Sequence, residues 1–222
     1  MDISNVQQTW NRLEQDLEKI NRLNLERLRE VNLDRAQSKL KSLVWQQVIT
    51  IAFYVLAGSY FLHFSVTHWE NWHYLASGGI LSAWSFIASA SSVYQLQLIL
   101  TIDYSMPVLQ LQKQLMKIKT AIIKNLRIGV WMLPFYLAFV VWISNVLLGI
   151  DFIEVADESA LAWNVILSVF LIPLAWWMHR KLNPKNTDKQ WLNWLLQGSG
   201  SQVNEALVFL RKIDEFEKES EV

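Results

Sequence analysis

The stretch LVWQQVITIAFYVLAGSYFLHF, residues 43–64, decides the fold because it contains no Asp, Glu, Lys or Arg. A helix of about 20 apolar residues covers the roughly 30 Å of hydrocarbon in a bilayer. Three further uncharged runs follow, at about residues 74–96, 128–150 and 161–178. The sequence therefore predicts an all-α, polytopic membrane protein built around a four-transmembrane-helix bundle.

Basic residues are distributed unevenly over the polar segments around these runs. Of the 20 Lys and Arg, eight lie in residues 1–42, five in 101–127 and seven after 178. The segments near 65–73 and 151–159 contain none. Because cytoplasmic segments carry an excess of Lys and Arg, we expect both termini and the central segment in the cytoplasm.

These boundaries divide the chain into five expected parts. They are a cytoplasmic N-terminal helical arm (1–42), transmembrane helices 1 and 2 (43–100), a cytoplasmic amphipathic helix (101–127), transmembrane helices 3 and 4 (128–178) and cytoplasmic C-terminal helices (179–222). Pro134 and Pro173 fall inside the third and fourth runs, where we expect kinks. Cysteine is absent, which excludes disulfides and thiolate chemistry.

Apolar residues in the arm recur at alternating steps of three and four, the heptad spacing of a coiled coil: Ile3, Val6, Trp10, Leu13, Leu17 and Ile20. All of these except Ile3 are our candidate partner-binding residues. The spacing breaks at Asn24 and Arg27, and apolar residues resume in another phase from Leu33 to Leu43. We therefore expect the arm either to bend near Asn24 or to change its partner there.

The central segment repeats this pattern after a break at residues 103–107, where Pro107 suits the start of a helix. Leu111, Leu115 and Ile118 lie on its apolar face and are further candidate partner-binding residues. A basic stripe runs beside them: Lys113, Lys117 and Lys124. This stripe either faces anionic lipid headgroups or is a solvated face that helps to set the topology.

The tail adds two amphipathic pieces, one around residues 191–195 and one from Val203 to Leu210, separated by Gly198-Ser199-Gly200-Ser201. Ser201 is the expected N-cap of the last helix. The glycine-serine segment indicates a hinge more than a phosphate cradle, because no nucleotide motif follows. Three amphipathic segments predict either an intramolecular three-helix bundle under the membrane or a surface kept for another protein or a second copy.

The second run is rich in small residues four apart, and Gly78, Ser82, Ser85 and Ser89 are the expected helix-packing residues. The centres of the runs carry no ionisable residue, which argues against a proton relay or an ion-coupled transporter. A pore lined by serine in an oligomer stays open as an alternative.

The outer turns hold the remaining candidates for chemistry. His68, Glu70 and His73 are weak metal candidates, because imidazole and carboxylate groups bind zinc, but they follow no ligand motif. Interfacial histidines beside an acidic loop are the simpler interpretation. No catalytic motif is present, so we expect neither an enzyme nor a bound cofactor.

Three short stretches carry a resemblance: LVWQQ at 43–47, IDYSMP at 102–107 followed by LQLQK at 109–113, and QGSG at 197–200. They resemble an uncharacterised family of bacterial four-span inner-membrane proteins, of the kind encoded beside alternative sigma factors. The resemblance implies a membrane-bound anti-sigma or signalling role.

From these features we expect a membrane-anchored regulatory or interaction protein. Its cytoplasmic helices would bind a protein partner or associate with a second copy, its spans would contact the lipid bilayer, and it would not contact nucleic acid directly. The main alternative is a homo-oligomeric channel or a transport accessory subunit, and a membrane enzyme is the third.

Overall fold

The computed structural model describes residues 3–183 and 199–220, and within these ranges the chain forms helices joined by turns, with no strand. The predicted all-α class is confirmed. The predicted amphipathic piece at 191–195 lies outside the described residues. The elements are α1 (Ile3–Thr67), α2 (Trp72–Leu100), α3 (Val108–Val130), the 3-10 turn η1 (Leu133–Phe135), α4 (Tyr136–Leu148), α5 (Phe152–Val155), α6 (Glu158–Lys181) and α8 (Ser199–Ser220).

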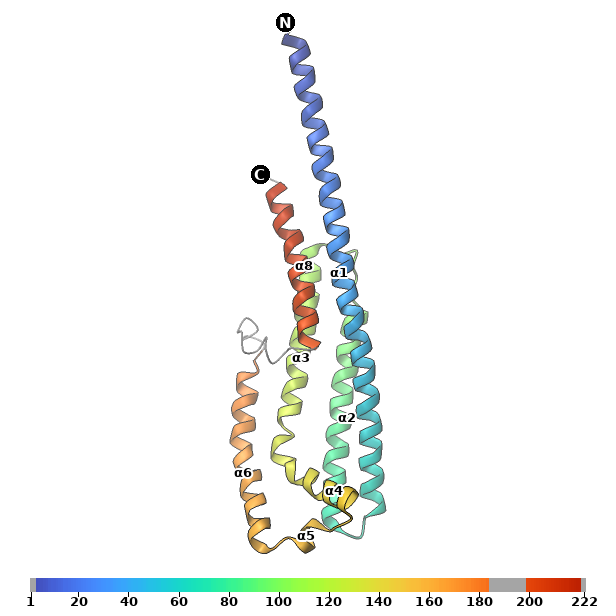
Figure 1. Ribbon diagram of the computed structural model, residues 1–222, viewed down its shortest axis with the longest axis vertical. Helices are drawn as coiled ribbons and strands as arrows, with labels where there is room; N and C mark the ends of the chain where they lie inside the picture. The colour runs from blue at the N-terminus through green and yellow to red at the C-terminus, as the bar shows by residue number, and fades with distance from the viewer. Residues whose placement is uncertain (1–2, 184–198, 221–222) are drawn as a thin grey trace.

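Helix α1 joins the N-terminal arm to the first apolar run without interruption (Figure 1). No Gly or Pro precedes Gly58, so nothing in the arm weakens or blocks helical hydrogen bonding. The helix is continuous through Asn24, so the change of apolar phase there is not a break in the helix. The other expectation for this position remains, namely that α1 contacts a different partner before and after Asn24.

Three helical stretches are long and apolar enough to cross a membrane: Arg12–Thr67, Val108–Leu148 and Glu158–Lys181. Helix α2, which holds the expected second span, is not among them, although it has 29 residues and no charged side chain. Serine, glycine and glutamine lower its mean hydropathy. The structure therefore supports three candidate spans, and the predicted fourth span, in α2, stays a prediction.

The third predicted span is divided at Pro134. Helix α3 continues past residue 127 to Val130, η1 follows, and α4 leaves at a steep angle to α3 (Figure 1). Proline has no N–H to donate to the preceding turn, so a helix is interrupted where it occurs. In contrast, α6 remains α-helical through Pro173.

The last helix begins earlier than expected. Helix α8 starts at Ser199, so Ser201 lies inside its first turn and the predicted N-cap role of Ser201 is wrong. The predicted helix break at residues 103–107 is confirmed, because α2 ends at Leu100 and α3 begins at Val108. In the turn between them, the Asp103 carboxylate accepts hydrogen bonds from both the N–H and the hydroxyl of Ser105.

The connections are arranged at two ends of the molecule (Figure 1). The N-terminal arm, the α2–α3 turn and the end of α8 lie at one end. The α1–α2 turn and the α4–α5–α6 connection lie at the other. The basic segments therefore share one end and the segments without Lys or Arg share the other.

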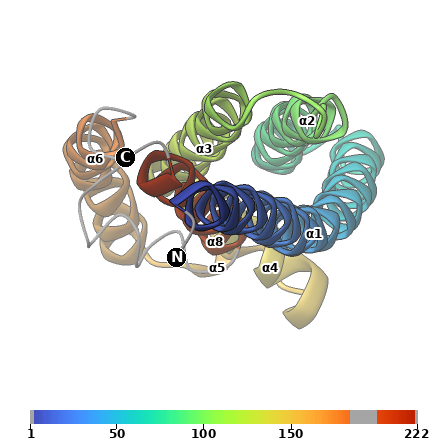
Figure 2. The same ribbon diagram turned by 90° about the horizontal axis from the view of Figure 1, so that it is seen from above.

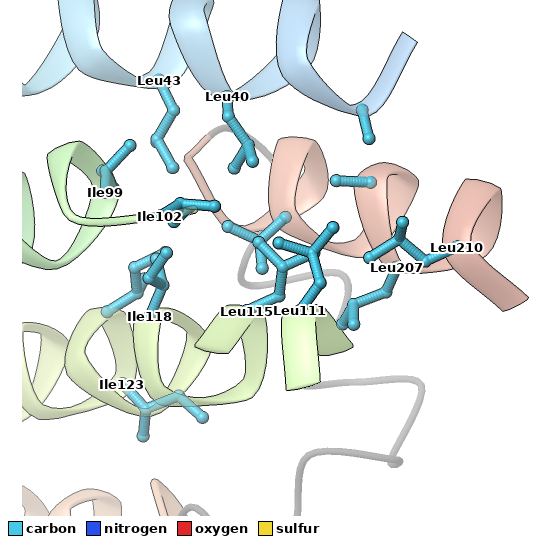
Figure 3. Close-up of a cluster of buried hydrophobic side chains, with 14 of the residues drawn as sticks. Leu40, Leu43, Ile99, Ile102, Leu111, Leu115, Ile118, Ile123, Leu207 and Leu210 are labelled. Carbon is cyan, nitrogen blue, oxygen red and sulfur yellow. The ribbon is translucent and has the colours of Figure 1, made fainter. Parts of the chain in front are cut away.

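The largest buried apolar cluster lies at the basic end, where α1, α3 and α8 pack together with the end of α2 (Figure 3). We call this cluster the three-helix core. Its α1 members are Ala36, Leu40 and Leu43, and each is almost completely buried. Two smaller clusters join α1, α2 and the α4 region toward the opposite end.

Candidate functional site

The exposed part of α1 carries one half of the apolar pattern seen in the sequence. Trp10, Leu13, Leu17 and Ile20 are 68%, 52%, 57% and 53% exposed. Their steps of three and four place them on one helix face. We call these four residues the docking stripe. The side chain of Val6, the fifth arm residue predicted to bind a partner, lies outside the described residues.

Helix α8 packs on α1 but does not reach the docking stripe. Three contacts set the register of α8 on α1: Gln202 donates to the Ser42 hydroxyl at 3.3 Å, Lys39 pairs with Glu205 at 2.6 Å, and the Arg35 guanidinium lies 6.0 Å from the Phe209 ring centroid. Residue numbers rise along α8 as they fall along α1, so the two helices are antiparallel. Continued at the same rise, this register brings Ser220 level with about Asn24.

The docking stripe therefore lies beyond the reach of α8, and α1 projects past the end of α8 (Figure 1). The tip from Ile3 to Asn24 is roughly 30 Å long at the rise of an α-helix. The stripe is also rotated by about a third of a turn from the face that enters the three-helix core, at 100° per residue. The two apolar faces of α1 are thus separate surfaces.

The candidate partner-binding residues of the central segment have a different environment. Leu111, Leu115 and Ile118 are almost completely buried in the three-helix core (Figure 3). They belong to one apolar cluster with residues of α1 and α8 of the same chain and are closed to a separate protein in this conformation. For these three residues, the structure agrees with the expectation of an intramolecular bundle and not with that of a surface kept for another protein.

The small residues of α2 lie against α1. Gly78, Ser82, Ser85 and Ser89 are all buried. A Cβ added at Gly78 would lie 2.7 Å from Ser65 Cβ and 2.8 Å from the Phe61 carbonyl oxygen, so the two backbones approach closely here.

The polar face of α2 is therefore occupied by helix packing. Gln47 of α1 donates to Gln95 of α2 at 3.2 Å, and the Ser85 hydroxyl donates to the Leu81 carbonyl. The face that α2 leaves exposed is apolar and includes Ile80, Phe86 and Ile87. Within one chain, the serines are placed to pack and not to line a lumen.

The weak metal candidates are not gathered into one site. His68, just after the end of α1, has its Nδ1 3.0 Å from the Phe64 carbonyl oxygen, while Glu70 is exposed to solvent. His73 lies 2.7 Å from Asp151. Among residues 3–183 and 199–220, no group of three His, Asp or Glu is positioned to hold a metal ion.

The contact between His73 and Asp151 joins the start of α2 to the start of α5, and it was not expected from the sequence. Asp151 is also the N-cap of α5, accepting from the N–H groups of Ile153 and Glu154. Burial acts to raise the pKa of Asp151, but hydrogen bonds from His73, Tyr74 and the Ile153 N–H outweigh it, so the pKa lies below its usual value. The carboxylate form is the one that holds this contact.

Neither a protein-family model nor a curated protein nor a solved structure matches this chain. The described side chains offer binding surfaces: an apolar stripe on a projecting helix, a closed three-helix core behind it, and helices with apolar faces turned outward.

Proposed function

We propose that this chain is a membrane-anchored interaction protein that presents the docking stripe of α1 to a helical protein partner in the cytoplasm. The main supporting observation is that the stripe is exposed, whereas Leu111, Leu115 and Ile118, the other candidate partner-binding residues, are buried in the three-helix core. Four large side chains left in water on one helix face are typical of a surface that a partner covers.

The chemistry of the tip favours an apolar partner surface. Residues 10–24 carry three basic side chains and, with Glu18, three acidic ones, so the tip has no strong charge of either sign. Burial of each stripe residue would contribute about 1.5–3 kcal/mol before the costs of association are subtracted. A helix with its own apolar seam is the surface that matches a heptad stripe.

We propose four spans for the anchor, with α2 as the fourth. Support comes from its length, its lack of charge and the burial of its serines against α1, which leaves apolar side chains toward lipid. The gathering of all basic segments at one end supports cytoplasmic termini in a bacterial inner membrane. A sigma factor as the partner agrees with the sequence resemblance and belongs to the same proposal.

The topology is tested by labelling single cysteines with a membrane-impermeant thiol reagent in intact cells, since the natural chain has no cysteine. Glu70→Cys and Glu154→Cys should react, and Ser38→Cys and Val208→Cys should react only after the membrane is opened. Reaction of Ser38→Cys from outside would contradict the proposed orientation.

The docking stripe is tested with Leu13→Asp/Leu17→Asp in the full chain. Its matched control is Gln15→Asp/Leu23→Asp, which adds two charges to exposed positions on other faces of the same helix segment. After crosslinking in cells and purification in detergent, the wild-type and control chains should retain one partner in a fixed ratio, and the stripe variant should lose it.

Circular dichroism of all three chains provides the folding control, because the stripe lies outside the three-helix core. Retention of the partner by the stripe variant would contradict the proposal. A change from a symmetric oligomer to monomers in the stripe variant would identify the partner as a second copy. Ion flux through liposomes holding the purified chain alone would favour the channel alternative.

A further inference from the structure

A groove runs along α3 on the side turned away from the three-helix core. It has a volume of about 450 Å³ and is bordered by Tyr94 of α2 and by Lys113, Lys117 and Lys124 of α3. Helices α2 and α3 lie side by side here, with α1 and α8 on the other side of α3 (Figure 2). We call this feature the lysine groove.

The helical register of α3 explains why the lysines converge. At 100° per residue, Lys113, Lys117 and Lys124 fall within about 40° of one another, on the face opposite Leu111, Leu115 and Ile118. All three are exposed, and none forms an ion pair with another residue of the described parts of the chain. Asp103 is the single acidic residue between positions 71 and 150. The groove is therefore a concave surface of uncompensated positive charge.

The groove lies close to the proposed boundary of the membrane. Arg127, one turn beyond Lys124, donates to the Leu182 carbonyl at the end of α6. In the last turn of α6, Arg180 lies 4.7 Å from the Trp176 ring centroid and Lys181 lies 5.7 Å from that of Trp177. Tryptophan beside basic residues at the cytoplasmic end of an apolar helix marks the headgroup layer.

The lining has two chemical characters. Lysine ammonium groups are compact donors that suit phosphate oxygens, and the buried amide nitrogen of Gln112 has no hydrogen-bond partner among the described residues. Leu109 and Met116 border the same groove with exposed apolar side chains, 61% and 39% exposed. Met116 lies between Lys113 and Lys117 along α3, so a phosphate held by the lysines would have an apolar side chain beside it.

We propose that the lysine groove binds the headgroup of an anionic phospholipid from the cytoplasmic leaflet. The phosphate contacts the three lysines, Met116 borders the glycerol, and the acyl chains run along α3 past Lys124 toward the bilayer. This site is separate from the docking stripe, so the lipid contact orients the three-helix core against the membrane whether or not a partner is bound.

The test uses the full chain with a single cysteine, Met116→Cys, labelled with a small fluorophore and placed in nanodiscs of phosphatidylcholine. A fixed minor fraction of either brominated phosphatidylglycerol or brominated phosphatidylcholine serves as quencher. We expect stronger quenching by the anionic lipid. Each lysine should contribute about fivefold to the preference, so Lys113→Gln/Lys117→Gln/Lys124→Gln should lose roughly a hundredfold.

Two further triple variants separate a site from general attraction. Arg12→Gln/Lys19→Gln/Lys41→Gln removes the same charge from exposed positions of α1 and should keep the preference. Lys113→Arg/Lys117→Arg/Lys124→Arg keeps the charge in the groove and should retain most of it. Circular dichroism confirms that each variant folds.

Equal quenching by the two lipids, or an equal loss in the α1 triple variant, would overturn the proposal. Soluble inorganic phosphate and glycerol phosphate are added at millimolar concentration as competitors. If either removes the preference completely, the groove is a site for a soluble phosphate compound and the lipid assignment is wrong.

Discussion

Two segments of one continuous helix, residues 10–20 and residues 33–43 of α1, have nearly the same apolar spacing and opposite environments. Leu13 and Leu17 are half exposed, whereas Leu40 and Leu43 are almost completely buried. Both pairs are leucines of the same helix, so residue type does not separate them. The difference is the position of α8, which packs on the face of α1 that carries Leu40 and Leu43 and stops at about the level of Asn24, whereas the docking stripe lies beyond that level and on another face.

The comparison shows how the arm combines stability with availability. The covered segment closes a three-helix core that can fix the direction of α1 relative to the membrane. The uncovered segment continues the same helix beyond that core, so its side chains are held at a defined distance and orientation. A stripe on a rigid helix loses less conformational entropy on binding than one on a flexible tail.

The largest expected effect comes from shortening a side chain in the covered segment. Leu40→Ala should lower the free energy of unfolding by about 2–5 kcal/mol, because it leaves a cavity in the three-helix core. Leu13→Ala, the matched change in the docking stripe, should alter it by no more than about 0.5 kcal/mol. Unfolding in detergent micelles followed by circular dichroism measures both, and similar losses would break the distinction between the two segments.

The second prediction extends the comparison to the part of α1 that packs on α2. Gly78→Ala places a methyl group 2.7 Å from Ser65 Cβ and 2.8 Å from the Phe61 carbonyl oxygen, so the helices must separate, at a cost of about 1–3 kcal/mol. Gly129→Ala is the control, since its added Cβ meets no atom within 4 Å, and it should be neutral or stabilising. Equal stability of the two variants in the same unfolding assay would contradict the close helix approach.

The third prediction concerns the outer end, where Asp151 holds His73. Because the pKa of Asp151 is lowered in the folded chain, its contribution is complete above the ordinary carboxyl pKa of about 3.9 and is lost as the pH falls through the lowered native value. Hydrogen exchange of α5, measured against pH in the acid range, should show this loss. Asp151→Asn should show fast exchange at every pH, and an unchanged profile would show that the carboxylate contributes nothing.

The smallest expected effect is at the ion pair that joins α1 to α8. The Lys39 ammonium lies 2.6 Å from Glu205, and both side chains are nearly half exposed. A double-mutant cycle with Lys39→Gln and Glu205→Gln should give a coupling of about 0.2–1 kcal/mol that declines with added salt. A coupling near zero would leave the apolar packing of Leu207 and Leu210, together with the Gln202 and Arg35 contacts, to align α8 on α1.

Some parts of this structure could be predicted from the sequence because they depend on neighbours along the chain. The helix breaks at Asp103 and Pro134, and the seam break at Asn24, follow from local spacing and backbone chemistry. Other parts could not. The apolar spacing of Leu111, Leu115 and Ile118 predicted a helix face that packs, and the spacing of the docking stripe predicted another. In the structure the first face is buried and the second is exposed.

The amino-acid sequence by itself determined that the chain is helical, where its long apolar runs lie and which ends share the basic residues, since hydrophobicity, charge and helix periodicity act over a few turns. Only the tertiary structure decided which apolar face of α1 is covered, because heptad spacing predicts that a helix face packs but does not identify the element that packs on it. The tertiary structure also brought His73 to Asp151, 78 positions apart, and turned three lysines of α3 toward a groove beside Tyr94. Those contacts depend on how separate helices align, and side-chain spacing within one helix carries no record of that alignment.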